Sequence, residues 1–335
     1  MSIGASALVA LAVTMTACPL LVGALRRLQV VDRPNGRSLH DTPIPRGGGL
    51  AVAGGALIGL ALVDPLTLPW RGALLAAALG FGVLGLVEDL RGVPALRRLG
   101  LQVLVAAALL PLLLHDLRGP LAWQLVFGVG VLLWLVSYVN AFNFMDGING
   151  VSASQATVAG VAWWAMGRSA EVPALAAGGL IVAGAAAGFA PFNFPRAQVF
   201  LGDVGSYLLG AWLAVLVVIA LRGGLPLEAA VAPVLVYLAD TAATIVRRLR
   251  GNEAWYEPHR HHAYQRLVIA GWSHTRTTVL IAGLVAACSA LGAVSLVDSP
   301  ALRAAADVGL VVIVAAYLSV PSRVSHHSRS VVPAT

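Results

Sequence analysis

Long apolar segments recur along this chain from end to end, and they constrain its fold more than any other feature. About eleven of them approach the length that a helix needs to cross a hydrocarbon core of roughly 30 Å. A segment in lipid must satisfy its own backbone hydrogen bonds, so we expect helices. Their approximate spans are 3–25, 48–63, 72–87, 99–114, 121–140, 151–167, 173–190, 205–221, 226–246, 277–296 and 304–320. The sequence predicts an all-α integral membrane protein with about 10–11 transmembrane helices.

Composition indicates one membrane domain. Hydrophobic residues make up 59% of the chain and charged residues 11%, against roughly a quarter charged in soluble domains. We find no repeat of fixed period and no segment polar enough for a soluble domain. The sequence therefore predicts a single transmembrane domain over 1–321, followed by a disordered cytoplasmic tail over 322–335. Both cysteines, Cys18 and Cys288, lie in apolar spans, where a packing role is expected.

Arginine placement predicts the orientation. The chain has no lysine, so all 22 basic residues are arginines. Placing the amino terminus outside leaves only Arg71, Arg118, Arg168, Arg222 and Arg303 in outer loops. Cytoplasmic loops carry the excess of positive charge in membrane proteins. We therefore expect an outer amino terminus and read the first segment as a retained signal anchor, since no positive charge precedes it.

Three polar clusters interrupt the apolar pattern, all on the predicted cytoplasmic face. They occupy 140–150, 200–206 and 259–262. Polar and ionisable groups at membrane depth are costly unless they line a wet cavity or bind a ligand. The clusters therefore indicate a functional site on the cytoplasmic face.

The first two clusters have the chemistry of a magnesium site. Asn143 and Asp146 are three residues apart and share one face of a helix or turn. Asp203 lies between Gly202 and Gly205 just before an apolar span. Such oxygen ligands suit Mg²⁺, which shares its coordination shell with water and substrate phosphates. The alternative for Asp203 is a helix N-cap.

Two further loops on this face are open to two interpretations each. In the adjacent pair Glu88–Asp89, repulsion raises the pKa of one carboxyl, which suits a proton acceptor or a cation ligand; the alternative is a charged helix end. Arg46 precedes the three glycines of 47–49. Their N–H groups could approach an anion, or the glycines could simply soften a helix start.

The third cluster is the run His259-Arg260-His261-His262. It lacks cysteine partners for Zn²⁺, and imidazoles beside a guanidinium are suited to gripping a diphosphate. Asp240 lies seven residues before Arg247, on one helix face. An internal ion pair and a role in the site are equally open there.

In combination these motifs resemble a known family. Asn-x-x-Asp-Gly at 143–147, Phe-x-Gly-Asp-x-Gly-Ser at 200–206 and the downstream histidines occur in the order found in the polyprenyl-phosphate N-acetylhexosamine-1-phosphate transferases, glycosyltransferase family 4. The resemblance covers about 20–270. It implies a multi-pass protein of the bacterial inner (cytoplasmic) membrane that takes a UDP-N-acetylhexosamine and undecaprenyl phosphate and releases UMP.

The resemblance also implies roles for the acidic and amide residues. Asp203 would be the principal Mg²⁺ ligand, with Mn²⁺ as an alternative ion, beside Asn143. Asp146 would shape the metal and phosphate site as a catalytic residue. Glu88 and Asp89 stand where the family commonly has two aspartates, and Asp89 is the better candidate for the base that deprotonates or positions the prenyl phosphate.

Substrate contacts follow from the same resemblance. Phe200 would face the uracil, and Gly147 and Asn149 would line the nucleoside pocket, although the family often has Asp where this chain has Asn149. The remaining residues would bind or act on the phosphates, and these are Arg46, His259, Arg260, His261 and His262.

The form His-Arg-x-His-Ala-Tyr-Gln at 259–265 looks like that of the O-antigen and exopolysaccharide initiators. We therefore favour a UDP-sugar such as UDP-GlcNAc or a 6-deoxy relative as donor. The alternatives are the phospho-N-acetylmuramoyl-pentapeptide transferase of the cell wall, a secondary transporter of an anionic solute and a prenyl-diphosphate hydrolase. The sequence does not decide between direct attack and a two-step mechanism, but we prefer direct attack because positioning and a metal suffice for phosphoryl transfer. A homodimer is possible as well. The sequence pI of 10.2 is explained by a basic membrane face without nucleic acid.

Overall fold

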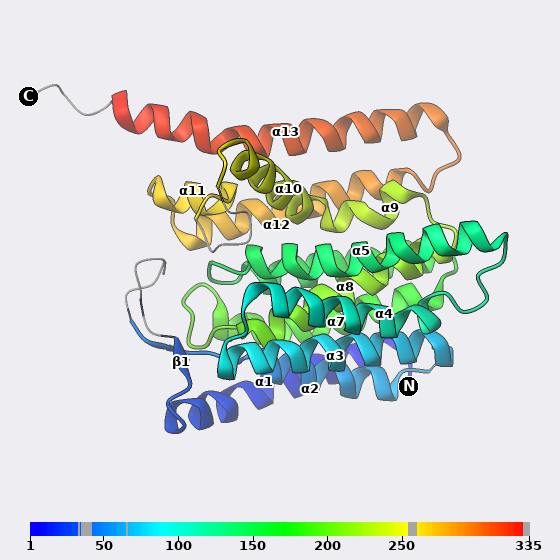
Figure 1. Cartoon of the computed structure of the whole chain (residues 1–335), viewed down its shortest axis with the longest axis horizontal. Helices are drawn as coiled ribbons and strands as arrows, with labels where there is room; N and C mark the ends of the chain where they lie inside the picture. Colours follow the sequence, from blue (N-terminus) through cyan, green and yellow to red (C-terminus); the bar gives the residue numbers. More distant parts are fainter. Residues whose placement is uncertain (33, 35–41, 65, 254–259, 331–335) are drawn as a thin grey trace, which may run out of the picture.

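A computed structural model describes residues 1–32, 34, 42–64, 66–253 and 260–330, with side chains as far as Pro321. Helices lie side by side and run mostly along the long axis of the molecule (Figure 1). In the described part, the one sheet is the antiparallel pair β1 (Val31–Asp32) and β2 (Ile44–Pro45). The prediction of an all-α bundle is confirmed, and the chain is a multi-pass membrane protein.

Every predicted span coincides with helix. By length and apolarity, nine of the described helical segments can cross a membrane, and α2 is a shorter apolar helix. The helices are α1 (Ile3–Arg27), α2 (Gly49–Leu62), α3 (Leu68–Arg91), α4 (Ala95–Leu113), α5 (Leu121–Met145), α6 (Val151–Ser169), α7 (Pro173–Asn193), α8 (Gly202–Arg222), α9 (Leu227–Val231), α10 (Leu235–Arg250), α11 (Ala263–Ile269), α12 (His274–Val294) and α13 (Pro300–Ser330).

Helix α8 forms the centre of the bundle and is buried along almost its whole length. Two glycines let its neighbours approach it closely. A Cβ atom at Gly49 of α2 would lie 2.2 Å from Gly205 Cα, and one at Gly85 of α3 would lie 2.1 Å from the Asp203 carbonyl oxygen. Small residues permit this backbone contact in membrane proteins, where dispersion rather than hydrophobic burial holds helices together. The result is that α2 and α3 both touch the start of α8.

The predicted span 226–246 is a broken helix, which corrects the expectation of one continuous span. A 3₁₀ turn over Ala232–Val234, containing Pro233, separates α9 from α10. Proline removes a backbone donor and opens the helix. Two α6 side chains accommodate the break, since Gln155 Nε2 donates to the Pro233 carbonyl at 2.8 Å and Trp163 Nε1 to the Ala230 carbonyl at 3.2 Å.

The last helix extends beyond the predicted domain boundary. The structure continues α13 through Pro321 to Ser330, whereas the sequence predicted a disordered tail from residue 322. Neither glycine nor proline occurs between 322 and 330, so no residue there is a strong helix breaker. Residues 331–335 lie outside the described part.

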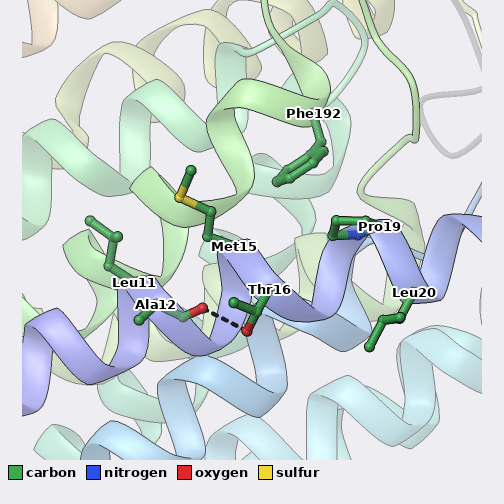
Figure 2. Close-up of a pocket in the computed structure, with 7 residues that line it drawn as sticks. All are labelled: Leu11, Ala12, Met15, Thr16, Pro19, Leu20 and Phe192. Atoms are coloured by element: carbon green, nitrogen blue, oxygen red, sulfur yellow. Dashed lines mark hydrogen bonds between the residues drawn. The ribbon is translucent and has the colours of Figure 1, made fainter.

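An apolar groove of about 690 Å³ runs along the surface of α1 beneath the end of α7. Figure 2 shows its lining, with the Thr16 hydroxyl bonded back to the Ala12 carbonyl at 2.8 Å. Its lining contains no titratable side chain, so the groove is not a centre for acid–base or metal chemistry. The lining residues are Leu11, Ala12, Met15, Thr16, Pro19, Leu20 and Phe192.

Candidate active site

The first loop is joined by backbone hydrogen bonds to the segment that precedes α8. Gly47 and Gly48 donate to the Phe200 carbonyl at 3.1 and 2.9 Å, and Gly49 donates to the Leu201 carbonyl at 2.7 Å. These glycine N–H groups are therefore used within the protein. Of the two interpretations of this loop, the glycine-opened helix start is correct, and the anion cradle is wrong. A Cβ at Gly48 would lie 2.5 Å from the Phe189 ring, so close packing explains that glycine.

Asp89, at the end of α3, caps the start of α8. Its Oδ1 accepts from the Asp203 N–H at 3.0 Å and its Oδ2 from the Val204 N–H at 2.9 Å. The first N–H groups of a helix lack partners within it and attract negative charge. Asp203 does not cap its own helix, so the N-cap alternative for it is wrong. The Asp203 side chain is therefore available to the site, where its Oδ1 accepts from Asn143.

Arg46 links the two carboxylates. Its Nε lies 2.7 Å from Asp89 Oδ1, and a terminal guanidinium nitrogen lies 2.8 Å from Asp203 Oδ2. The side chain of Asp89 is 4% exposed, that of Asp203 17% and that of Arg46 35%. The cluster therefore opens to solvent on the side of Arg46 and Asp203.

The end of α5 supplies an amide and a third carboxylate. Asn143 Nδ2 donates to Asp203 Oδ1 at 2.8 Å and to Ser206 Oγ at 2.9 Å. The Ser152 hydroxyl donates to Asp146 Oδ1 at 2.6 Å. Burial raises the pKa of Asp146 to about 7, with the charges of Asp203 and Asp89 adding to the increase. Three neighbouring carboxylates thus share one guanidinium, and the cluster has a surplus of negative charge.

This donor set fits a magnesium ion. Its partly exposed residues, Asp203 and Asn143, offer carboxylate and amide oxygens, which Mg²⁺ prefers. Over the described residues, no three Asp, Glu, His or Cys side chains form a ready-made metal cage. Mg²⁺ suits such an open arrangement because it keeps several waters and completes its shell with substrate phosphates.

The described part of the third polar cluster, residues 260–262 (the histidine loop), is held against α10. Asp240 accepts from His262 Nδ1 at 3.3 Å, and Arg247 donates to the His261 carbonyl at 3.0 Å. Of the two alternatives for Asp240, the internal ion pair with Arg247 is therefore wrong. Tyr264 of α11 donates its hydroxyl to the Phe144 carbonyl at 3.0 Å, which joins this loop to the end of α5. His259 lies outside the described residues.

A buried amide that sequence reasoning missed shapes the turn between α5 and α6. Asn193 Oδ1 accepts from the Gly150 N–H at 2.6 Å, and Asn193 Nδ2 donates to the Val199 carbonyl at 2.9 Å. Asn149 Nδ2 donates to the Pro195 carbonyl at 3.2 Å. An asparagine at the end of an apolar helix was the available signal.

The chain is similar in sequence to a known family of enzymes. The family described as "Glycosyl transferase family 4" matches residues 72–221. A decaprenyl-phosphate N-acetylglucosaminephosphotransferase of Mycobacterium leprae is 32% identical over 310 residues, covering 78% of this chain and 76% of the relative. The chain belongs to glycosyl transferase family 4. The matched segment runs from α3 to α8 and contains Asp89, Asn143, Asp146 and Asp203.

Two other similar proteins bear different names. A probable undecaprenyl-phosphate N-acetylglucosaminyl 1-phosphate transferase of Bacillus subtilis is 27% identical over 301 residues, 86% of this chain and 83% of the relative. A phospho-N-acetylmuramoyl-pentapeptide-transferase of Desulforudis audaxviator is 31% identical over 331 residues, 83% of this chain and 94% of the relative. Both extend the match well beyond 72–221.

In this family 4 chain, not every predicted residue joins the carboxylate cluster. Glu88 faces the α3–α4 turn, where it accepts from the Val93 N–H at 2.9 Å and pairs with Arg98 at 3.2 Å. The alternative of a helix-end charge therefore describes Glu88, whereas Asp89 belongs to the site. His261 is half-exposed and lies 3.6 Å from Glu253.

The remaining predicted substrate contacts lie around the cluster. Phe200 pairs by its backbone with the first loop, donating to the Pro45 carbonyl at 2.8 Å. Gly147 is in contact with the Tyr264 hydroxyl, which a Cβ there would approach to 2.1 Å. Arg260 is half-buried. The roles of these residues toward a nucleotide or a phosphate stay predictions.

Proposed function

We propose that this protein transfers an N-acetylhexosamine 1-phosphate from a UDP-sugar to undecaprenyl phosphate and releases UMP. The reaction would be the first membrane step of a surface polysaccharide or cell-wall glycan in the bacterial inner membrane, with the site on the cytoplasmic side. The observation that carries the proposal is the Arg46–Asp89–Asp203 cluster at one end of an apolar bundle. It offers a site for a metal and phosphates at a level that a membrane-anchored acceptor can reach.

Asp203 and Asn143 would hold the ion, Mg²⁺ or in its place Mn²⁺. When bound, such an ion neutralises charge that develops on transferring phosphates. Asp203 suits this position because its carboxylate is the more exposed of the two that Arg46 bridges, and Asn143 fixes its orientation. Arg46 would move from the carboxylates toward a substrate phosphate, for which a guanidinium is a matched partner.

Our proposal divides the acid–base roles differently from the prediction made from the sequence. Both oxygens of Asp89 accept N–H groups of α8, and one also pairs with Arg46. We therefore assign Asp89 to holding α8 and Asp203 in place. Asp146 is the better candidate to accept the acceptor's proton, because a group with a pKa of about 7 exchanges protons readily near neutral pH.

The test is to incubate purified protein with undecaprenyl phosphate, Mg²⁺ and single UDP-sugars, and to measure UMP and the lipid product. We expect UMP release that requires both the lipid and a UDP-N-acetylhexosamine. Product with UDP-N-acetylmuramoyl-pentapeptide alone would favour the cell-wall reaction, to which the Desulforudis audaxviator relative points. Free sugar phosphate without a lipid-linked sugar would indicate a hydrolase, and the absence of any chemistry would favour a transporter.

A further inference from the structure

The turn between α5 and α6 carries a side-chain oxygen that the described part of the protein does not use. In this turn, residues 146–150, Gly147 is exposed and Asn149 is partly exposed. Asn149 Nδ2 donates to the Pro195 carbonyl at 3.2 Å. A carbonyl oxygen only accepts, so a flipped amide would place two oxygens against each other. The hydrogen bonds of Asn149 with described residues leave its Oδ1 without a donor.

The backbone of Asn149 is held by the start of α12. The Thr278 hydroxyl donates to the Asn149 carbonyl at 2.8 Å, and the Asn149 N–H donates to His274 Nδ1 at 3.5 Å. Asn149 precedes Gly150, the N-cap of α6, so its carbonyl has no place in the hydrogen-bond ladder of that helix. A backbone carbonyl away from water needs another partner. Thr278, which is 1% exposed, supplies it from a distant part of the chain.

These bonds together fix the direction of the amide oxygen. Helix α12 holds the backbone of Asn149, and the Pro195 carbonyl holds its amide nitrogen. The turn begins at Asp146, whose N–H donates to the Asn143 carbonyl at 3.2 Å, so it lies directly beside the carboxylate cluster. Oδ1 of Asn149 is therefore an oriented acceptor, on a partly exposed residue, next to the proposed site of transfer.

We propose that Thr278 is a positioning residue through which the protein selects the nucleobase of its donor. It holds the backbone of Asn149 so that Oδ1 faces the base. An acceptor fixed in this way matches uracil, whose N3 carries a hydrogen, and opposes cytosine, whose N3 is itself an acceptor. The inference rests on the proposed transferase function, since it concerns the donor of that reaction. A purely structural role would be limited to packing α12 against the turn.

Thr278→Val removes the hydroxyl with little change of shape. We expect the KM for the UDP-N-acetylhexosamine to rise about tenfold, the size of one hydrogen bond, with kcat within about threefold of wild type. The preference for UMP over CMP is the ratio of their Kd values, measured by calorimetry without lipid. It should fall by a similar factor. Thr278→Ser keeps the donor and should restore both quantities to within about threefold.

Thr277→Val is the matched control. Thr277 is the preceding residue and is 0% exposed, but its hydroxyl donates to the Ser273 carbonyl of its own helix at 3.1 Å. Its replacement should leave the KM and the UMP preference within about threefold of wild type. Equal effects of Thr277→Val and Thr278→Val, or an unchanged UMP preference in Thr278→Val, would overturn the inference in favour of helix packing.

Asn149→Ala tests the residue through which Thr278 acts. It retains the backbone carbonyl that Thr278 contacts but removes Oδ1, so we expect it to abolish the UMP preference. In this background, Thr278→Val should change the preference less than about twofold. A UMP preference that survives Asn149→Ala would overturn the inference, even if Thr278→Val yields no folded protein.

Nucleotide binding also separates this inference from the proposed reaction. A wild-type protein that binds UMP and CMP equally would overturn the selection of the base. One that prefers UMP but releases none in the presence of lipid and UDP-sugar would refute the transfer reaction instead, and the Kd ratios of the variants would still decide the role of Thr278.

Discussion

Replacing Asp89 by Asn tests whether the start of α8 is held by a charge from α3. The carboxylate accepts two α8 N–H groups and pairs with Arg46. An amide has one oxygen for these donors, and its NH₂ group would face the other N–H. At least one charge-assisted hydrogen bond is lost, at about 1.5–3 kcal/mol. We expect the free energy of unfolding to fall by about 2 kcal/mol.

The effect on catalysis should be larger than the loss of stability suggests. Asp203 is the second residue of α8, so any relaxation of the helix start moves its side chain. A displacement of about 1 Å in a catalytic group can cost about 100-fold in rate. We therefore expect Asp89→Asn to lower the rate of UMP release at least about 100-fold, although the base in our proposal is Asp146.

Glu88→Gln is the matched control, because Glu88 precedes Asp89 but contacts Arg98 and Val93 instead. It should lower the rate less than about tenfold, as expected for a partly exposed ion pair. The assay is UMP release by protein that elutes as a single species in detergent, with thermal unfolding measured alongside. Equal, mild losses for both variants would refute the assignment of Asp89 to the site.

Three other predictions concern the metal, the packing and the topology. Asp203→Ala should abolish transfer while the protein still inserts in membranes, and chelator should stop the wild type; full turnover in chelator would contradict the metal proposal. Gly49→Ala should lower the unfolding temperature, because overpacking costs about 1–3 kcal/mol. Gly54→Ala should not lower it, because a Cβ there meets nothing within 4 Å. Equal melting temperatures of the two variants would argue against the α2–α8 contact. In a cysteine-free background, a cysteine near Arg118 should react with an impermeant thiol reagent outside intact cells and one near Arg250 should not, and the reverse result would invert the topology.

Sequence patterns located the helices because the relevant information is local. An apolar segment long enough for the membrane must form its hydrogen bonds within itself, so each predicted span coincides with helix, although the one over 226–246 is broken. The break at Pro233 was also signalled locally, but proline in a membrane helix is tolerated when a neighbour forms hydrogen bonds with the freed backbone groups. That neighbour is Gln155 of α6, and no pattern around residue 233 identifies it.

For the site, the sequence predicted which residues would take part, but it did not predict which groups they would contact. Asp203, Asn143, Asp146 and the acidic pair were recognisable as costly polar groups at helix ends. The sequence ranked Asp89 above Glu88 only by resemblance. The structure gives the physical reason. Gly85 of α3 is in close contact with the start of α8, and Asp89 lies one helical turn further along α3. Asp89, and not Glu88, therefore reaches the start of α8.

By itself, therefore, the sequence determined that the chain is a helical membrane protein with a polar, phosphate-suited face, since length, apolarity and motif spacing act over a few turns of one helix. Only the tertiary structure decided which hydrogen-bond donors each carboxylate accepts from. Asp89 and the Asp203 N–H are 114 residues apart, and Asp240 and the Tyr317 hydroxyl 77. Such pairs form when packed helices bring their ends together, and that packing depends on the fit of all the helices at once.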